Sequence, residues 1–189
     1  VGFICFVIWE LRVEQPVLEM KLFFENRMFA FSNLAALINY MSIFAVVFLL
    51  SLYLQFIKGF DPSVAGLILV VQTVFMVIMS PIAGRLSDKF EPRKIASLGM
   101  GIATIGLLIF ALITAETSLY VLVLGLAILG IGIGLFSAPN THAIMGSVQK
   151  RYFGVASATV STMRLTGQTL GMGMILVIFA VNVGAVQFT

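Results

Sequence analysis

Charged residues are scarce in this chain, and their scarcity decides its class. Lys and Arg number 11 and Asp and Glu number 8 among 189 residues, whereas 60% of the residues are hydrophobic. The mean hydropathy is +1.11. Soluble domains contain about 25% charged and about 45–50% apolar residues. The composition therefore excludes an ordinary soluble domain and indicates a membrane protein.

Cysteine and the common catalytic motifs are also missing. The sequence has one cysteine, Cys5, which excludes an intrachain disulfide framework and a cysteine-based metal cluster. It contains no Walker loop, no His/Glu zinc motif and no serine nucleophile elbow. We therefore expect no catalytic residue, no metal site, no cofactor and no nucleic-acid partner, and we predict that the chain is not an enzyme.

Long uncharged runs occupy most of the sequence instead. Four of them contain no charge, and each exceeds the roughly 18–20 residues that cross a bilayer core: Met28 to Ile57, Pro62 to Gly84, Ile95 to Ala115 and Thr117 to Gln149. A fifth run, Tyr152 to Thr189, is interrupted by Arg164. The runs lack the alternation of barrel strands. They predict an all-α fold, a polytopic membrane helical bundle, because a backbone in lipid must pair its own polar groups.

The predicted membrane spans divide the chain into two parts. We expect spans near residues 34–54, 65–83, 95–113, 120–138 and 155–180. The stretch "VGFICFVIW" is too short for a span and is interpreted as the last half of a membrane helix, followed by an amphipathic connection. The prediction is therefore that residues 1–27 form the end of a central membrane helix with its connection, and that residues 28–189 form five transmembrane helices.

Basic residues gather on one side of this predicted map. Lys58 lies on the other side, whereas nine basic residues lie in the connections of the first side: Arg12, Lys21, Arg27, Arg85, Lys89, Arg93, Lys94, Lys150 and Arg151. Cytoplasmic loops carry the excess of Lys and Arg in membrane proteins. We therefore expect a multi-pass protein of the cell membrane, in contact with the lipid bilayer, whose basic loops are cytoplasmic.

The loop "AGRLSDKFEPRK" concentrates charge between two spans. One interpretation is a topology anchor. The other is suggested by the order of Gly84, Asp88, Lys89 and Arg93, which resembles the cytoplasmic signature of the major facilitator superfamily, where a glycine starts a tight turn. The Asp88 carboxylate would then hold one conformation of a transporter by contacting a neighbouring bundle. Glu91 stands where the family pattern usually has glycine.

Further stretches extend this resemblance along nearly the whole chain. They are "ELRVEQPVLEMKLFFENRMF", "SLYLQFIKGFDPSVAGLILV", "GIGIGLFSAPN" and "RYFGVASATVSTMRLTGQTLG", and together they look like the C-terminal part of the 14-helix drug:proton antiporter branch. The resemblance implies a partial C-terminal bundle whose N-terminal bundle is missing here. It also implies a secondary transporter that exports drugs or other small hydrophobic molecules in exchange for protons. The alternative is a non-transporting membrane sensor or assembly partner of the same fold.

One charged residue stands within a predicted span. Arg164 lies about ten residues beyond the basic edge of its helix, or ~15 Å at 1.5 Å per residue. Ser157, Ser161 and Gln168 share its helical face, which Gly154 and Gly171 extend. Because an arginine costs roughly 2.5–3.5 kcal/mol at the bilayer centre, we expect it to face substrate or a carboxylate across a cavity. The alternative is an arginine bonded to backbone carbonyls of its own bundle.

Other polar and small residues lie at membrane depth. Asn39, Tyr40 and Gln72 either line a cavity or join neighbouring helices by hydrogen bonds. Pro81 and Pro139 are expected to bend the ends of their spans. Five glycines predict surfaces where helices approach closely: Gly130, Gly132, Gly134, Gly167 and Gly171.

Overall fold

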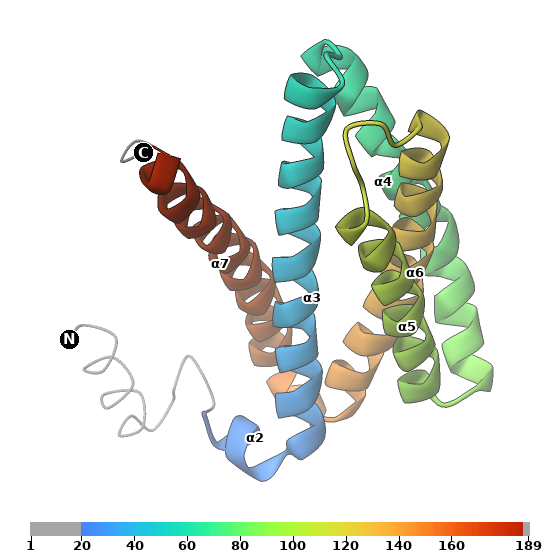
Figure 1. Ribbon diagram of the computed structural model, residues 1–189. Coiled ribbons are helices and arrows are strands. Elements are labelled where there is room, and N and C mark those ends of the chain that lie inside the picture. Colours follow the sequence, from blue (N-terminus) through green and yellow to red (C-terminus); the bar gives the residue numbers. More distant parts are fainter. Residues whose placement is uncertain (1–19, 187–189) are drawn as a thin grey trace.

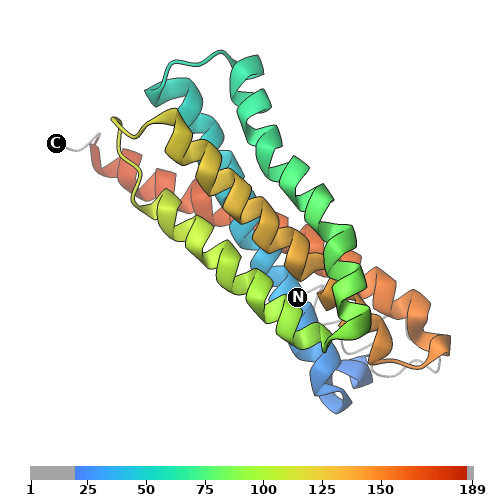
Figure 2. The same ribbon diagram turned by 90° about the vertical axis from the view of Figure 1, so that its right-hand side faces the viewer.

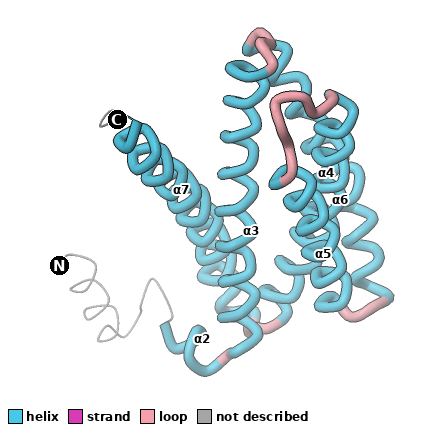
Figure 3. Tube along the Cα trace, viewed as in Figure 1, coloured by secondary structure: helices cyan, strands magenta, loops and turns pink. Residues whose placement is uncertain are grey.

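The computed structural model describes residues 20–186, and all regular structure within that range is helical (Figures 1 and 3). The connections lie at the two ends of the bundle (Figure 3). The long helices are α3 (Arg27–Leu52), α4 (Pro62–Lys89), α5 (Pro92–Ala111), α6 (Leu119–Gly146) and α7 (Phe153–Val186). The short elements are α2 (Met20–Glu25), the π-helix η1 (Tyr53–Ile57) and the 3-10 turn η2 (Lys150–Tyr152).

Five helices of the described part are long and apolar enough to cross a membrane. They cover Arg27–Ile57, Pro62–Lys89, Pro92–Ala111, Leu119–Gly146 and Lys150–Val181. The predicted all-α bundle and its five spans are therefore confirmed. The half helix predicted up to Trp9 and Cys5 itself lie outside the described residues.

Helix α6 is the centre of one half of the bundle and packs between α4 and α5 (Figure 2). Successive glycines of α6 pack alternately against α4 and α5. A Cβ added at Gly130 or Gly134 would fall 2.3 Å from the carbonyl oxygen of Gln72 or 2.8 Å from that of Met76, both on α4. One added at Gly132 would fall 2.4 Å from the backbone nitrogen of Ala103 on α5. The prediction that these glycines allow close packing is confirmed.

Helices α3 and α7 form the other half, with α3 lying between α7 and the remaining long helices (Figure 1). A Cβ added at Gly167 or Gly171 would lie 2.5 Å from the carbonyl oxygen of Leu37 or Met41, respectively, on α3. These two glycines therefore serve packing, as predicted. Gly171 was predicted to extend the polar face that contains Arg164, but Gly171 is buried against α3 and is not part of that open face.

Charged residues mark one end of the bundle, which we call the basic end; it contains the α4–α5 and α6–α7 connections and the start of α3. There Asn26 caps α3, since its Oδ1 accepts a hydrogen bond from the Phe29 amide at 3.1 Å. Its Nδ2 donates to the carbonyl oxygen of Ser147 at 2.6 Å. A single side chain thus joins the first turn of α3 to the end of α6.

The opposite end is joined by two side chains that reach between connections. Tyr53 Oη donates to the carbonyl oxygen of Thr114 at 2.6 Å, and Lys58 Nζ donates to that of Ala115 at 2.7 Å. Gly59 adopts a φ of +71°, where other residues are strained, and so turns the chain from η1 towards α4. The α3–α4 and α5–α6 connections are thereby held together.

Two helices extend beyond the membrane spans predicted for them. Helix α6 continues through Pro139 to Gly146, although a span ending near Ala138 was predicted. Proline within a membrane helix is tolerated because local adjustments and neighbouring groups pair the freed backbone polar atoms. Helix α4 likewise continues to Lys89, so Gly84 is helical and does not start a turn. An added Cβ at Gly84 would meet nothing within 4 Å, so no helix approaches it closely.

Candidate functional site

The polar face predicted on α7 is present and open. Ser157, Ser161 and Arg164 are exposed, and Gln168 is half-buried. Ser161 Oγ donates to the carbonyl oxygen of Ser157 at 3.1 Å, which is a bond within the helix. The Arg164 guanidinium makes no hydrogen bond or ion pair with any residue of the described range. Within residues 20–186, therefore, no backbone carbonyl accepts a hydrogen bond from Arg164, as the alternative interpretation would require.

Asn39 of α3 lies between helices rather than on this open face. Its side chain is 5% exposed, and its Nδ2 approaches Sδ of Met100 on α5 at 3.2 Å. The contact links α3 to α5 at membrane depth. Of the two interpretations considered for Asn39, the geometry of the described residues corresponds to an interhelical link.

Gln72 is also buried, at 7% exposure, where Gly130 of α6 packs on its backbone. Its side-chain Oε1 has no hydrogen-bond donor within the described range. Leaving a buried acceptor unpaired costs ~1–3 kcal/mol, so this residue keeps one unused acceptor at the α4–α6 contact. Tyr40 is half-buried on α3. Five of the six predicted cavity residues thus divide between the α7 face and two interhelical contacts, and Tyr40 belongs to neither group.

The loop residues occupy the basic end. Asp88 and Lys89 are exposed in the last turn of α4, and Arg93 is exposed in the first turn of α5. Within the described range none of these three side chains has an ion-pair partner, whereas Lys94 Nζ lies 3.4 Å from Glu91 Oε2. The Asp88 carboxylate is therefore accessible to a partner from outside residues 20–186.

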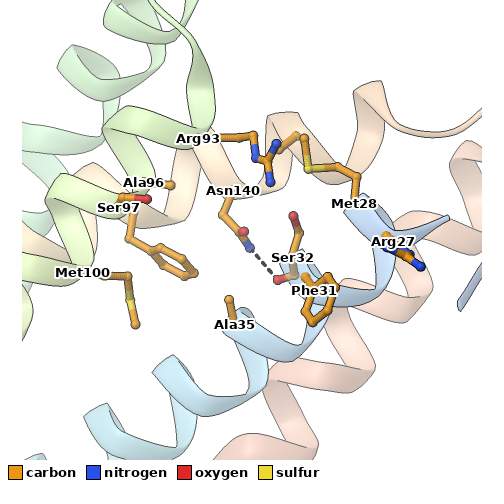
Figure 4. A pocket seen from close by; sticks show the side chains of 12 residues that line it. Arg27, Met28, Phe31, Ser32, Ala35, Arg93, Ala96, Ser97, Met100 and Asn140 are labelled. Carbon is orange, nitrogen blue, oxygen red and sulfur yellow. Dashed lines mark hydrogen bonds between the residues drawn. The ribbon is translucent and has the colours of Figure 1, made fainter.

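Sequence reasoning missed Asn140. This residue of α6 is 6% exposed, and its Nδ2 donates to the carbonyl oxygen of Ser32 on α3 at 3.1 Å (Figure 4). The bond borders a cavity at the basic end that the sequence did not predict. A signal existed in the helical stripe of Met28, Ser32 and Ala35, which all line it. Nothing in the spacing identified the facing helices.

Clusters of potential metal ligands were also examined by residue type. No group of three or more His, Cys, Asp or Glu side chains between residues 20 and 186 could hold a metal ion. What the chain presents is a membrane bundle with an open polar helix face and a charged loop at one end.

Comparison with known proteins identifies the family. The profile of the Major Facilitator Superfamily matches residues 32–186. Riboflavin transporter RibZ of Clostridioides difficile (strain 630) is 34% identical over 178 residues, which cover 94% of this chain and 39% of that protein. Multidrug transporter protein MdtP of Bacillus subtilis (strain 168) is 30% identical over 175 residues, covering 93% and 32%, respectively.

Multidrug resistance protein Stp of Mycobacterium tuberculosis (strain ATCC 25618 / H37Rv) is 29% identical over 175 residues, which cover 93% of this chain and 32% of that protein. The chain thus spans 32–39% of the length of these three relatives. All three are named as transporters or resistance proteins. Five membrane-spanning helices and a family match over most of its length show that this chain belongs to the Major Facilitator Superfamily, a family of integral membrane transporters and not of enzymes.

Proposed function

We propose that the protein is a secondary active transporter of the plasma membrane that exports drugs or other small hydrophobic molecules in exchange for protons. The observation that carries the proposal is the open face of α7, where Arg164 is exposed between Ser161 and Gln168. An arginine at this depth costs roughly 2.5–3.5 kcal/mol if it faces lipid. The face therefore borders water, substrate or protein in the membrane.

Transporters of this type rock one helical bundle against another around a central site. Arg164 would meet a carboxylate or an anionic group of the substrate across such a site, and Ser157 and Ser161 would supply hydroxyl groups beside it. If that carboxylate pairs with Arg164 when ionised and leaves it when protonated, proton binding would be coupled to substrate release. The proposal assigns Arg164 to binding and Gln168 to the wall of the cavity.

The names of the relatives support the substrate class. One relative is named for riboflavin and two for multidrug transport or resistance. Riboflavin and many drugs are small organic molecules with flat ring systems, so a cavity formed mainly by apolar helices with a few polar groups suits their rings. The proposal therefore covers a range of such molecules and singles out none.

Orientation and switching follow from the charged end. Within the described range Lys58 lies at one end, and eight basic residues lie at the basic end: Lys21, Arg27, Arg85, Lys89, Arg93, Lys94, Lys150 and Arg151. The positive-inside rule then places the basic end in the cytoplasm. Asp88 would act there as a latch that pairs with a second bundle in one state and separates from it in the other.

Transport by the purified full-length protein tests the proposal. In proteoliposomes with an imposed pH gradient, ethidium and riboflavin would be used as separate substrates. We expect gradient-dependent movement of at least one of them, abolished by a protonophore. Movement that persists without any proton gradient would contradict coupling, and specific binding without movement would instead support the sensor or assembly partner.

A further inference from the structure

A cavity of about 610 Å³ lies between α3, α5 and α6 at the basic end (Figure 4). Its walls are mostly apolar and come from Met28, Phe31, Ala35, Met100 and Phe136, among others. In Figure 4 the Arg93 side chain extends from α5 towards Met28 across this space. Phe31, at 68% exposure, shows that the wall on α3 continues onto the outer surface of the bundle.

A second groove of about 810 Å³ follows the neighbouring face of α5. Leu98, Gly101, Ile102 and Ile105 line it, and its basic end holds Arg93 and the ion pair between Lys94 and Glu91. Leu98 and Ile105 are 64% and 54% exposed. An added Cβ at Gly101 would meet nothing within 4 Å, so this part of the groove is empty.

The two grooves meet at Arg93, which lines both. Ser97 also belongs to both, so they run side by side along α5 from one guanidinium. A third cavity of about 500 Å³, beside His142 and Ser147, is lined by Arg93 as well. Arg93 has no anionic partner within the described range, and Arg27 stands on the α3 side of the first cavity.

The length of the grooves matches one leaflet of a bilayer. Twelve residues separate Arg93 from Ile105, which is about 18 Å along a helix that rises 1.5 Å per residue. Half of a hydrocarbon core of roughly 30 Å is about 15 Å. Arg93, in the first turn of α5, lies at the level of lipid headgroups when α5 spans the membrane.

We propose that Arg93 and the two grooves on α5 form a binding site for one anionic phospholipid. The headgroup phosphate accepts hydrogen bonds from the Arg93 guanidinium, and Arg27 adds positive charge, whereas Lys94 is paired with Glu91. One acyl chain lies in the cavity between α3 and α5, and the other lies along Leu98 and Ile102. The pairing of one unpaired cation with two apolar grooves fits a molecule with one anionic head and two chains, and basic pockets between membrane helices are known to bind such headgroups.

Such a lipid would fill the gap between α3 and α5, which are joined at greater depth by Asn39 and Met100. This site is separate from the polar face of α7, and its occupancy is measurable without transport. The proposal therefore does not depend on the proposed function.

Lipid retention by the purified full-length protein tests whether the site requires an anionic headgroup and the Arg93 charge. Native mass spectrometry would compare dioleoyl phosphatidylglycerol with dioleoyl phosphatidylcholine, which share their acyl chains. We expect tighter binding of phosphatidylglycerol and a loss of about fivefold in its affinity for Arg93→Gln, because one interfacial cation contributes ~1 kcal/mol. Arg85→Gln, which removes an exposed charge from the same end but lines none of the three cavities, is the matched control.

A second pair of variants tests the grooves without changing charge. Gly101→Leu fills the empty part of the groove on α5, whereas Gly66→Leu adds the same side chain to α4, where an added Cβ also meets nothing within 4 Å. We expect both variants to fold, because leucine is the better helix former and an added Cβ meets open space at both positions. We expect Gly101→Leu to weaken phosphatidylglycerol binding and Gly66→Leu to leave it unchanged.

Three results would overturn the proposal. Equal retention of the two lipids would remove the need for an anionic headgroup. Equal losses in Arg93→Gln and Arg85→Gln would reduce the effect to surface charge. Displacement of the lipid by millimolar inorganic phosphate would identify a site for free phosphate in place of a lipid.

Discussion

At the scale of single residues, Arg164 is the most informative position. It is the one charged residue between Phe153 and Val181, and its side chain is exposed without a partner in the described range. A charge at this depth in the membrane loses its hydration unless water or another polar group meets it there. The identity of that group separates a role in transport from a role in folding.

Substitutions at Arg164 distinguish these roles. Arg164→Lys keeps the charge but loses the planar fork that binds a carboxylate with two hydrogen bonds. If Arg164 meets substrate or a carboxylate, we expect Arg164→Lys to lower transport about tenfold, equivalent to ~1.4 kcal/mol, with little change in Tm. Efflux and detergent melting would be measured together for the Lys, Gln and Met variants.

The control for Arg164 is Arg151→Gln, which removes a cation that lies over the Tyr152 ring at the basic end. It is expected to leave transport nearly intact. Arg164 variants that transport normally, whatever their melting temperature, would exclude Arg164 from the transport site.

Asp88 provides a second test at the residue scale. Asp88→Asn removes the charge but keeps the shape, and it breaks no contact within the described range. If Asp88 pairs with a second bundle, the substitution shifts the balance between conformations, so transport falls at normal protein level. The topology-anchor interpretation expects little change, because acidic residues contribute weakly to orientation. Efflux per unit of membrane protein decides between them, with Glu91→Gln as the comparison.

At the scale of the helices, α6 depends on closely packed backbones. The Gly132 Cα faces α5 so closely that any side chain must move Ala103. Association of membrane helices relies on such van der Waals contacts between small residues, because lipid offers no hydrophobic driving force between them. The glycines of α6 thus determine which helices are neighbours.

Gly132→Ala is expected to destabilise the protein by ~1–3 kcal/mol, the usual cost of overpacking. Its added methyl group would lie 2.4 Å from a backbone atom that has no freedom to rotate away. Gly66→Ala is the matched control, since its methyl group meets open space and alanine favours the helix. Thermal unfolding in detergent would be compared, and equal Tm values for the two variants would contradict the packing assigned to Gly132.

At the scale of the whole molecule, the α4–α5 and α6–α7 connections lie at the basic end, and the α3–α4 and α5–α6 connections lie at the opposite end. The basic end and the end that contains Lys58 are separated by the full length of the helices (Figure 1). This arrangement agrees with the alternation of spans predicted from the sequence. Which end faces the cytoplasm is a separate property and is tested by labelling.

Cysteine labelling in intact cells tests the orientation. In a Cys5→Ser background, Glu91→Cys and Ser63→Cys place exposed thiols at the basic and opposite ends. Ser87 suits this purpose less, because it is 7% exposed and donates to the carbonyl oxygen of Ala83. We expect an impermeant reagent to label Ser63→Cys alone, and both variants once the cells are permeabilised. Labelling of Glu91→Cys alone in intact cells would reverse the orientation.

The sequence by itself determined the fold class, the five spans and the packing role of the glycines, because apolar length and small side chains act locally. It also placed Ser161, Arg164 and Gln168 on one face, since helical spacing does so directly. It did not determine where helices end, as Pro139 shows, because continued backbone pairing in a membrane outweighs the local preference of proline.

Only the tertiary structure decided which polar residues lie between helices and which stay open. Membrane helices are apolar on most sides, so the period of the sequence does not show which face meets a neighbour. Asn39 and Gln72 were therefore indistinguishable from cavity residues until α5 and α6 were in place. The convergence of two grooves on Arg93 likewise depends on the positions of α3, α5 and α6, which are set by contacts distant in sequence.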